Sequence, residues 1–578
     1  MVFLLILFPL KPLGAVDSEF VDSESGLKLR VITEEGDTGT VEVIRHDYTE
    51  SFYNIPATIE YNGIVYTVTS IGEYAFYDCK SLTSVTIPAT VLAIRSHAFY
   101  LCDNLVSVVI SEGVQHIEES AFNGCKSLYS IFIPDSVTSL GEYVFYDCNN
   151  LEFIQFSSDS QLREIGQKAF YGCTGLRSFV IPNNVTSIED FAFYNCMNLT
   201  SISIPEGVKR IGQYAFYECD NLRTIVLPES LIDLDEYVFY GCDNLKEIKF
   251  LEPSGISAIG KNTFYYCTGL QSVIIPEGVT SIDEFAFYGC TSLVSIILPE
   301  SLQTIGESAF NACNNLSSIY IPQNVIDIGG YAFYDCDTLE RVEFADESKI
   351  KVIGANAFYN CKGLRTTIVP ESVTDIEAYA FYNCENLTSI TIPWQVTSIG
   401  SGAFDSCSSL REVLMQPLIA PAIEENIFNN CASDLVVFVQ PTAQGYFDGI
   451  WANFNVHQIK LMSIVAPEPV TGIKNGAVKT VQGLGLPNTV TLILSGGIKR
   501  QASIIWKVDE CAYNPNDTKK QTFEVEGVVI LPDDLPNPDG IPLLAKVLVT
   551  VEEAESGFLP VSAITVIAAG GSDRVVVG

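Results

Sequence analysis

The sequence has little positive charge. Of its 578 residues, 32 are Lys or Arg and 70 are Asp or Glu, which gives a formal net charge of −38 and a pI near 4.3. A surface with this charge repels the phosphate backbone of nucleic acids and the anionic head groups of membranes. The composition therefore argues against nucleic acid as a partner.

The residues that usually carry chemistry are also scarce. The four histidines (His46, His97, His116 and His457) are scattered, and no Cys-x-x-Cys pair occurs, so no zinc site is expected. No Gly-rich phosphate loop follows a strand pattern and no Gly-x-Ser-x-Gly elbow is present. The acidic stretch 533–540, "DDLPNPDG", is broken by proline and does not fit a calcium loop. We predict no catalytic residue, no metal and no cofactor.

Long apolar runs are absent beyond the N-terminus. "MVFLLILFPLKPLGA", residues 1–15, has an apolar run from Val2 to Leu10 and ends at a small residue, which is typical of a secretory signal peptide. Because this stretch has no Lys or Arg before the run, a buried first strand or a misassigned start is the alternative. No other segment reaches the roughly 18 apolar residues that a membrane-spanning helix needs. We therefore expect export and no transmembrane segment in this chain.

One sequence pattern is present many times. "IGEYAFYDCKSLTSVTIP", which starts at Ile71, returns in similar form at Ile165, Ile259 and Ile353. Each of these 94-residue cassettes contains four shorter units, here called rungs, whose phenylalanines are spaced by 23, 23, 23 and 25 residues, until the last cassette ends with 24. The sixteen motif phenylalanines are Phe76, Phe99, Phe122, Phe145, Phe170, Phe193, Phe216, Phe239, Phe264, Phe287, Phe310, Phe333, Phe358, Phe381, Phe404 and Phe428.

Each rung contains one short strand pattern. "SVTI", Ser84–Ile87, alternates polar and apolar residues with period two, as a strand with one buried face does. A single rung cannot bury its own apolar residues, whereas stacked rungs align each apolar position into a shared core. The repetition therefore predicts an elongated solenoid.

The order Leu-x-x-Val-x-Ile-Pro, followed by Ile-Gly, Ala-Phe and Cys, resembles the BspA-like class of leucine-rich repeats, known from surface proteins of bacteria and some protists. The resemblance covers about residues 50–460 and implies an α/β-type repeat solenoid made mostly of strand and loop. Repeats of this class usually have Asn after the strand, but here the corresponding residues are Thr90, Gly113, Ser136, Asn184 and Gly207. We therefore expect an incomplete asparagine ladder.

The tail beyond the repeat has a different pattern. Two segments, 483–509 and 523–551, alternate as strands between Gly and Pro turns. Leu486–Val490, Trp506 and Val525–Gly527 resemble a bacterial immunoglobulin-like module, which implies an all-β sandwich that acts as a spacer, although some such modules bind glycan or protein. Cys511 stands alone, so the antibody-type disulfide is missing.

These patterns predict seven segments. "YNIPATIEYNGIVYTVTS", with an Asn62-Gly63 turn, suits a hairpin in an N-terminal cap, and Tyr446, Trp451 and Phe454 replace the Cys unit in a C-terminal cap. The last residues resemble the opening strands of another module, so we expect the native chain to continue. The predicted segments are a signal peptide (1–15), an N-terminal cap (16–70), the repeats (71–434), a C-terminal cap (435–460), a linker (461–482), the immunoglobulin-like domain (483–552) and a truncated further module (553–578).

Cysteine is plentiful and regularly placed. Sixteen of the seventeen cysteines follow a motif phenylalanine by three residues, from Cys79 to Cys431. Stacked rungs place these side chains in parallel, whereas a disulfide needs particular dihedral angles and an opposed approach. We predict a ladder of buried free thiols in which Cys serves as a small apolar residue.

The outward positions of the strands form the candidate binding surface. If Val85 and Ile87 point inward, one outward column is mostly Ser or Thr and the next is mostly apolar. Apolar strips of that length are unusual on a monomer unless something binds there, although β-branched residues also favour strands. Phe132 and Tyr320 are the strongest candidates because an aromatic residue on an open sheet has no structural duty. The candidate ligand-binding residues on this concave face are Val109, Phe132, Phe153, Val180, Val226, Ile274, Ile297, Tyr320, Ile368 and Leu414.

The sequence favours a binding protein over an enzyme. We expect a secreted or cell-surface, adhesin-like monomer that binds an extracellular protein or a glycan, and the family resemblance implies adhesion to host matrix proteins or to other cells. Two alternatives remain open at this point. The chain could be the targeting region of a larger extracellular enzyme, or a structural component of a cell surface.

Overall fold

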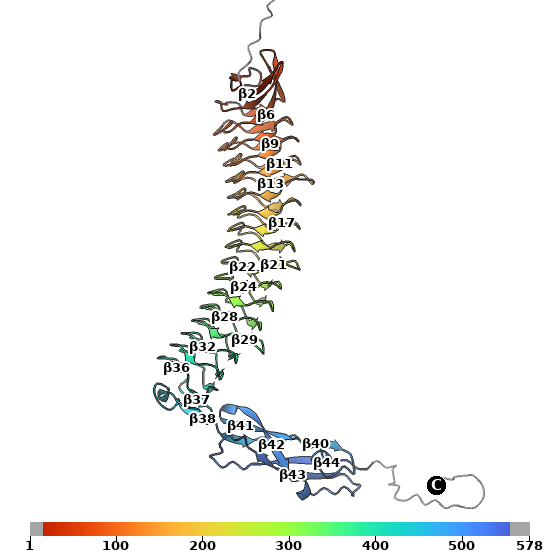
Figure 1. The fold of residues 1–578 in the computed structure, drawn as a ribbon, viewed down its shortest axis with the longest axis vertical. Coiled ribbons are helices and arrows are strands. Elements are labelled where there is room, and N and C mark those ends of the chain that lie inside the picture. The colour runs from red at the N-terminus through yellow and green to blue at the C-terminus, as the bar shows by residue number, and fades with distance from the viewer. Residues whose placement is uncertain (1–15, 555–578) are drawn as a thin grey trace, which may run out of the picture. The chain divides into compact units, whose positions relative to one another are not determined.

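The computed structural model describes residues 16–554 (Figure 1). The predicted signal peptide and nearly all of the predicted truncated module lie outside these residues. The described residues divide into two units. The first consists of the residues up to Val437 together with the later segment Gln444–Val456, and the second consists of Phe438–Ala443 and the residues from His457 onward. The expected repeat solenoid, made mostly of strand and loop, is confirmed. Its α/β-type class is corrected to a β-solenoid, because residues 16–554 contain no α-helix.

Six strands form the N-terminal cap. They are β1 (Glu19–Val21), β2 (Lys28–Glu35), β3 (Thr38–Val43), β4 (Phe52–Asn54), β5 (Thr58–Tyr61) and β6 (Ile64–Ile71). The predicted hairpin is confirmed, because β5 and β6 pair in antiparallel fashion through Asn62 and Gly63, whose φ angles are 54° and 76°. Positive φ at both central residues is the geometry that an Asn-Gly hairpin turn requires. Both β3 and β8 pair with β6 in parallel, and this starts the stack of rungs.

The predicted strand of each rung is confirmed. In β7 the side chains of Val85 and Ile87 are buried, and Thr86 of β7 lies beside Val109 of β9, so like positions meet in register. We call this series the first ladder; its strands are β7 (Ser84–Ile87), β9 (Ser107–Ile110), β11 (Ser130–Ile133), β13 (Phe153–Phe156), β15 (Ser178–Val180), β17 (Ser201–Ser203), β19 (Thr224–Leu227), β21 (Glu247–Phe250), β23 (Ser272–Ile274), β25 (Ser295–Ile297), β27 (Ser318–Ile321), β29 (Arg341–Phe344), β31 (Thr366–Ile368), β33 (Ser389–Ile392), β35 (Glu412–Met415) and β37 (Val436–Val439).

A second ladder of two-residue strands runs beside the first within every rung (Figure 1). The second residue of each strand is Ile or Leu, and it is buried in every strand except β36; so short a strand gives no alternation to recognise. Its strands are β8 (Ala93–Ile94), β10 (His116–Ile117), β12 (Ser139–Leu140), β14 (Glu164–Ile165), β16 (Ser187–Ile188), β18 (Arg210–Ile211), β20 (Asp233–Leu234), β22 (Ala258–Ile259), β24 (Ser281–Ile282), β26 (Thr304–Ile305), β28 (Asp327–Ile328), β30 (Val352–Ile353), β32 (Asp375–Ile376), β34 (Ser398–Ile399) and β36 (Ala422–Ile423).

Turns replace a helix on the remaining side of each rung. The residues two before and two after every motif phenylalanine have φ between 52° and 73°. With these φ angles, successive backbone N–H groups donate alternately to a carbonyl of the next rung and to a carbonyl of the same rung. Phe239 N–H, for example, donates to the Thr263 carbonyl of the next rung at 2.9 Å, and Tyr240 N–H donates to the Tyr237 carbonyl of its own rung at 3.3 Å. The backbone groups of this side are thereby satisfied without a helix.

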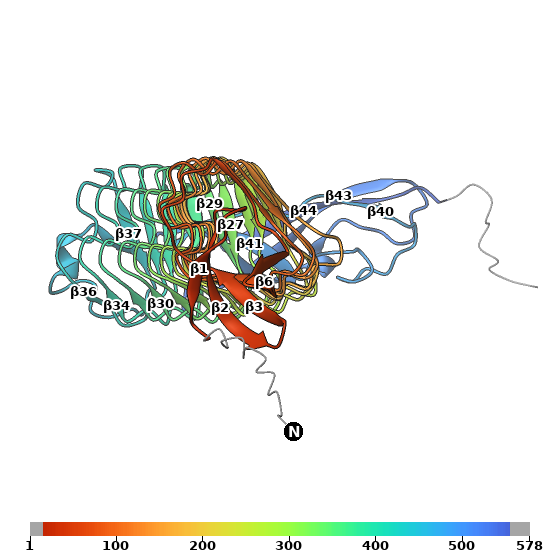
Figure 2. The ribbon, with the colours of Figure 1, turned by 90° about the horizontal axis from the view of Figure 1, so that it is seen from above.

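The core of the solenoid consists of columns of identical side chains. Consecutive motif phenylalanines are buried and stack with ring centroids 5.0–5.7 Å apart. The view down the stack shows the successive coils as similar outlines (Figure 2). Each rung therefore completes its core with the rungs before and after it.

Aromatic residues close the C-terminal end of the stack. Tyr446 and Trp451 are buried, with Trp451 in the 3₁₀ helix η1 (Trp451–Asn453), and Phe454 contacts Phe428 edge-on. The Tyr446 hydroxyl donates to the Pro417 carbonyl at 3.0 Å. These side chains cover the last phenylalanine of the column, which has no further rung to cover it.

The second unit contains one six-stranded sheet. Its order is β39-β41-β42-β43-β44-β40, antiparallel except between β44 and β40. Since all six strands belong to one sheet, the predicted two-sheet immunoglobulin-like sandwich is not confirmed. The segment that we expected to be a linker, 461–482, contributes β39 and β40. The elements are β38 (Val456–Gln458), β39 (Leu461–Ile464), β40 (Val470–Ile473), β41 (Thr489–Leu494), η2 (Ser495–Gly497), β42 (Lys499–Trp506), η3 (Val508–Glu510), β43 (Gln521–Ile530) and β44 (Leu544–Val551).

Candidate ligand-binding face

The outward side of the first ladder carries the candidate residues; we call it the open face. Strand alternation sends every second side chain away from the core. The backbone groups of these strands pair within four successive sheets, with breaks between β13 and β15, β17 and β19, and β25 and β27. Nine of the ten candidates have exposed side chains: Val109, Phe132, Phe153, Val180, Val226, Ile274, Ile297, Tyr320 and Ile368. Leu414 is only half-exposed. The open face is thus a row of side chains without a role in the core.

Charged columns border this row, and the sequence analysis missed them. Directly before the strands, one column includes Arg177, Arg223, Lys246, Arg365 and Arg411. Beyond the strands, after the motif proline or at the same position, an exposed column includes Glu112, Glu206, Glu229, Glu277, Glu300 and Glu371. Aligning the rungs at these positions would have revealed both columns. The face therefore has an acidic margin beyond the strands, whereas the margin before them is mixed, because Glu152 and Glu340 belong to the same column as the basic residues.

One residue interrupts the acidic margin. Trp394 is exposed and stands where the three earlier cassettes have Glu112, Glu206 and Glu300. It lines a hollow of about 480 Å³ together with Leu418 and Ile419, which are also exposed. Since the copied position holds Glu in those cassettes, duplication of cassettes does not explain this tryptophan.

The predicted ladder of buried thiols is confirmed. All seventeen cysteines are free, and only Cys431 and Cys511 are not fully buried. From Cys102 to Cys431, each ladder thiol donates to the carbonyl of the motif phenylalanine one rung earlier, at 2.9–3.3 Å. Burial raises the pKa of Cys102 to about 12 and that of Cys242 well above its usual range. Because a thiol reacts as its thiolate, these positions are structural and carry no chemistry near neutral pH.

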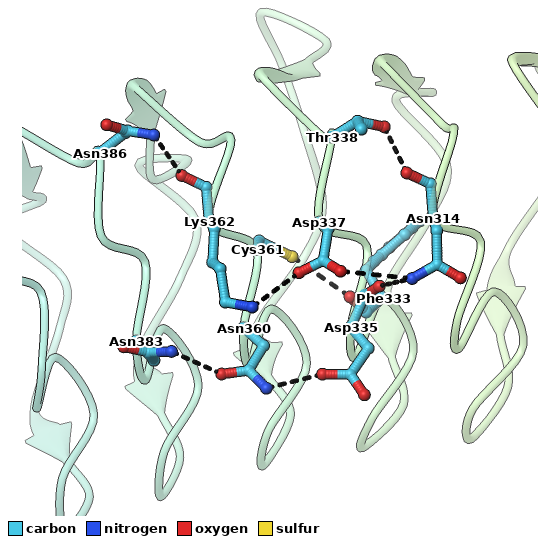
Figure 3. Close-up of polar contacts among 10 residues, drawn as sticks. All are labelled: Asn314, Phe333, Asp335, Asp337, Thr338, Asn360, Cys361, Lys362, Asn383 and Asn386. Atoms are coloured by element: carbon cyan, nitrogen blue, oxygen red, sulfur yellow. Dashed lines mark hydrogen bonds and ion pairs between the residues drawn. The ribbon is translucent and has the colours of Figure 1, made fainter.

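The incomplete asparagine ladder after the strand is confirmed, because Asn184 and Asn324 donate to the Ser160 and Glu300 carbonyls at 2.8 Å. A fuller asparagine ladder lies at another position. The side-chain amide of the residue two after the cysteine donates to a backbone carbonyl of the preceding rung, as from Asn221 to Met197 at 2.9 Å and from Asn386 to Lys362 at 2.8 Å. A parallel chain of contacts links Asn383, Asn360 and Asp335 (Figure 3). These polar groups tie rungs together, so we assign them to the scaffold and not to a ligand site.

The described chain offers no obvious metal or membrane site. Residues 16–554 contain no group of three or more His, Cys, Asp or Glu side chains that could hold a metal ion. No helix capable of crossing a membrane occurs within the same residues. The groove beside β12 and β14 is lined by several carboxylates, including Glu118, Glu142 and Glu164. Glu189 and Asp190, at its far end, are paired with Arg210 at 2.6 Å and 2.8 Å.

These features define a β-solenoid built from leucine-rich repeats. A protein-family model described as "BspA type Leucine rich repeat region (6 copies)" matches residues 48–174, 156–267, 250–350 and 343–445. These matches span more than half of the sequence, and the chain belongs to this family. A search of curated proteins gave no match.

Solved structures with similar chains include three from bacteria. A leucine-rich repeat protein from Bacteroides ovatus is 26% identical, with a TM-score of 0.47 over 71% of this chain and 98% of that one. A leucine rich cell surface protein from Faecalibacterium prausnitzii is 25% identical, with a TM-score of 0.35 over 69% and 94%. The pneumococcal vaccine antigen PcpA is 20% identical, with a TM-score of 0.35 over 77% and 97%.

Proposed function

We propose that the chain is a secreted or cell-surface binding protein, adhesin-like in function, whose open face contacts an extracellular protein or glycan. The observation that carries this proposal is the row of nine exposed apolar side chains on the first ladder. None of them fills the core, so these side chains are available to a ligand. Exposed apolar rows of this extent are characteristic of interaction sites.

The expected mode of binding is many weak contacts distributed over rungs. Aromatic side chains dominate protein interfaces because they bury a large area with few rotatable bonds. Phe132 on β11 and Tyr320 on β27 are the aromatic members of the apolar column, and they lie in different cassettes. Each is therefore expected to contribute more than an aliphatic neighbour, without being indispensable.

The remaining segments have supporting roles in the same proposal. Residues 1–15 direct export, and 16–70 and 435–460 cover the ends of the repeat at 71–434. The C-terminal sheet, which includes β39 and β40 as well as the strands of 483–552, serves as a spacer. No residue is proposed as catalytic. The family resemblance to surface proteins and the apolar run near the N-terminus support this location.

The proposal is tested by screening the purified full chain against arrays of matrix proteins and glycans. Phe132→Ser and Tyr320→Ser should each weaken binding of a captured ligand, and the double variant should weaken it further. Ile326→Ser is the matched control, because Ile326 is equally exposed but lies outside the open face. Binding that is unchanged in the double variant, or reduced equally by Ile326→Ser, would place the ligand elsewhere.

A further inference from the structure

Three residues of the open face differ from the others in a regular way. Val180, Ile274 and Ile368 have 68%, 60% and 78% of their surface exposed, whereas the other six exposed candidates range from 44% to 58%. They are 94 residues apart, so each occupies the same position in successive cassettes. Each belongs to the first strand after a 25-residue rung. We call these residues the boundary sites.

The preceding rung explains the greater exposure. That rung has a polar side chain at the equivalent position, namely Gln155, Lys249 or Glu343, and a two-residue insertion after its strand. Next to Ile368 this leaves a hollow of about 450 Å³ in the open face, with Arg341 and Glu371 among its lining residues. The apolar side chain therefore has a polar neighbour on one side and an open space beside it.

The charge around the boundary sites favours a basic ligand. At Ile368 the Arg341 guanidinium is paired with Glu343, and no ion pair within residues 16–554 involves Asp346 or Glu371. Both carboxylates are exposed, and near Ile274 the exposed Glu247, Glu252 and Glu277 outnumber Lys249. Near Val180 the equivalent positions hold Ser158 and Asn183, and Asp159 is the exposed acid of the preceding insertion. Uncompensated carboxylates beside an apolar contact complement Lys or Arg next to an apolar residue.

The spacing of the sites restricts the ligand further. Four strand spacings in a parallel sheet, at about 4.8 Å each, separate neighbouring boundary sites by roughly 19 Å. An extended polypeptide rises about 3.3 Å per residue, so residues six apart lie roughly 20 Å apart and on the same side of the chain. Spacings of four and eight residues also keep the side chains on one side of the peptide. They separate these side chains by about 13 Å and about 26 Å respectively, which does not match the distance between neighbouring boundary sites. A six-residue period therefore matches the three sites together.

From these observations, and resting on the proposed function of the open face, we infer that the ligand is an extended basic polypeptide segment with an apolar side chain at every sixth residue. The segment runs along the solenoid, across the strands, and seats three of its apolar side chains at Val180, Ile274 and Ile368. Its basic side chains face the acidic margin. Specificity then comes from the period of the ligand, because each contact alone is weak.

The test uses the full chain and synthetic peptides of Lys, Ser and Thr that contain three leucines spaced by four, six or eight residues. Fluorescence anisotropy should show that the six-residue spacing binds at least about tenfold more tightly than either other spacing, since two additional aliphatic contacts are made. Raising the salt concentration should weaken this binding, because the carboxylates and the peptide attract each other through solvent.

Variants locate the contacts. Ile368→Ser should weaken the six-residue peptide about three- to tenfold, and the triple variant Val180→Ser, Ile274→Ser, Ile368→Ser should abolish the preference for that spacing. The matched control Ile326→Ser, at an exposed isoleucine outside the open face, should change affinity less than twofold. Equal binding of the three peptides, no binding of any, or an equal effect of Ile326→Ser overturns the inference. If the array instead yields a glycan, or a protein that still depends on Phe132 and Tyr320, the inference fails while the proposed function remains.

Discussion

The repeat and the C-terminal sheet bury their cores in different ways. In the repeat, Phe239 lies between Phe216 and Phe264, and each of these rings has the same neighbours in turn. In the sheet, Trp506, Val525 and Val549 are equally buried, but each has a different set of neighbours. The repeat therefore uses one packing arrangement in every rung, whereas the sheet uses a different arrangement at each buried position. A condition that destabilises one rung destabilises all of them, whereas in the sheet the same condition acts on single positions.

The largest difference is expected in alkali. Burial raises the pKa of Cys102 and Cys431 to about 12, so the folded repeat holds these thiols protonated at a pH where an unfolded chain ionises them. Their stabilising contribution is complete below the ordinary thiol pKa, near 8.5, and is lost as the pH rises toward 12, at about 1.4 kcal/mol per pH unit for each thiol. Since the pKa is raised for the fifteen ladder thiols from Cys102 to Cys431, the repeat should unfold in this window.

Far-UV circular dichroism follows the repeat, and a variant that keeps Trp506 as its only tryptophan reports on the sheet. The sheet has a single, half-exposed cysteine and should unfold at a higher pH. The triple variant Cys219→Ala, Cys242→Ala, Cys267→Ala should reduce the steepness of the pH dependence. Unfolding of both regions at one pH, or an unchanged slope in the triple variant, would contradict this explanation.

The next largest effect is expected from a cavity in the phenylalanine column. Phe239→Ala should lower the free energy of unfolding of the repeat by about 3–5 kcal/mol, because the ring is fully buried and its neighbours are held at fixed spacing. Urea denaturation monitored in both regions should show the loss in the repeat alone. Phe523→Ala in the sheet is the matched control and should show the reverse. A common shift of both transitions would mean that the two cores unfold together.

A smaller effect is expected from the asparagine ladder. Asn221→Ala removes one side-chain hydrogen bond to the preceding rung and should cost about 1 kcal/mol of stability. Asn221→Thr is the informative control, because Thr338 occupies the same position in its own rung and its hydroxyl donates to the Asn314 carbonyl at 2.6 Å. Urea midpoints should rank wild type, Asn221→Thr and Asn221→Ala in that order. Equal urea midpoints for Asn221→Ala and Asn221→Thr would show that the side-chain hydrogen bond at this position does not stabilise the repeat.

The same comparison explains how much the sequence revealed. The strand at Ser84–Ile87, the phenylalanine column and the thiol column could be predicted because sixteen copies average out local accidents. The second ladder could not, because two residues show no periodicity. The turns beside each phenylalanine were also hidden, since Tyr237 or Lys168 is an unfavourable choice for positive φ and only the stack imposes it.

In the C-terminal sheet, which has no repeats to average, the prediction was weaker. The strands of the two alternating segments were recognised as β41–β44, but "VAPEPVTGI" suggested a linker although Val470–Ile473 is a strand. A short strand next to Pro and Gly is stabilised by its neighbour in the sheet and not by its own composition. On the open face, the alternation correctly placed nine side chains outward, whereas their binding role stays a prediction.

The smallest effect is the one that bears on function. Ile368→Thr keeps a β-branched residue in strand β31 and removes only apolar surface that the fold leaves exposed. The free energy of unfolding should therefore change by no more than about 0.5 kcal/mol. In contrast, Ile319→Thr, at a buried position of strand β27 on the same ladder, should lower the free energy of unfolding several times more. Urea denaturation of the two variants separates the two faces of one sheet. A large loss in Ile368→Thr would mean that the apolar row supports the strands themselves, and the row would then no longer be evidence for a ligand.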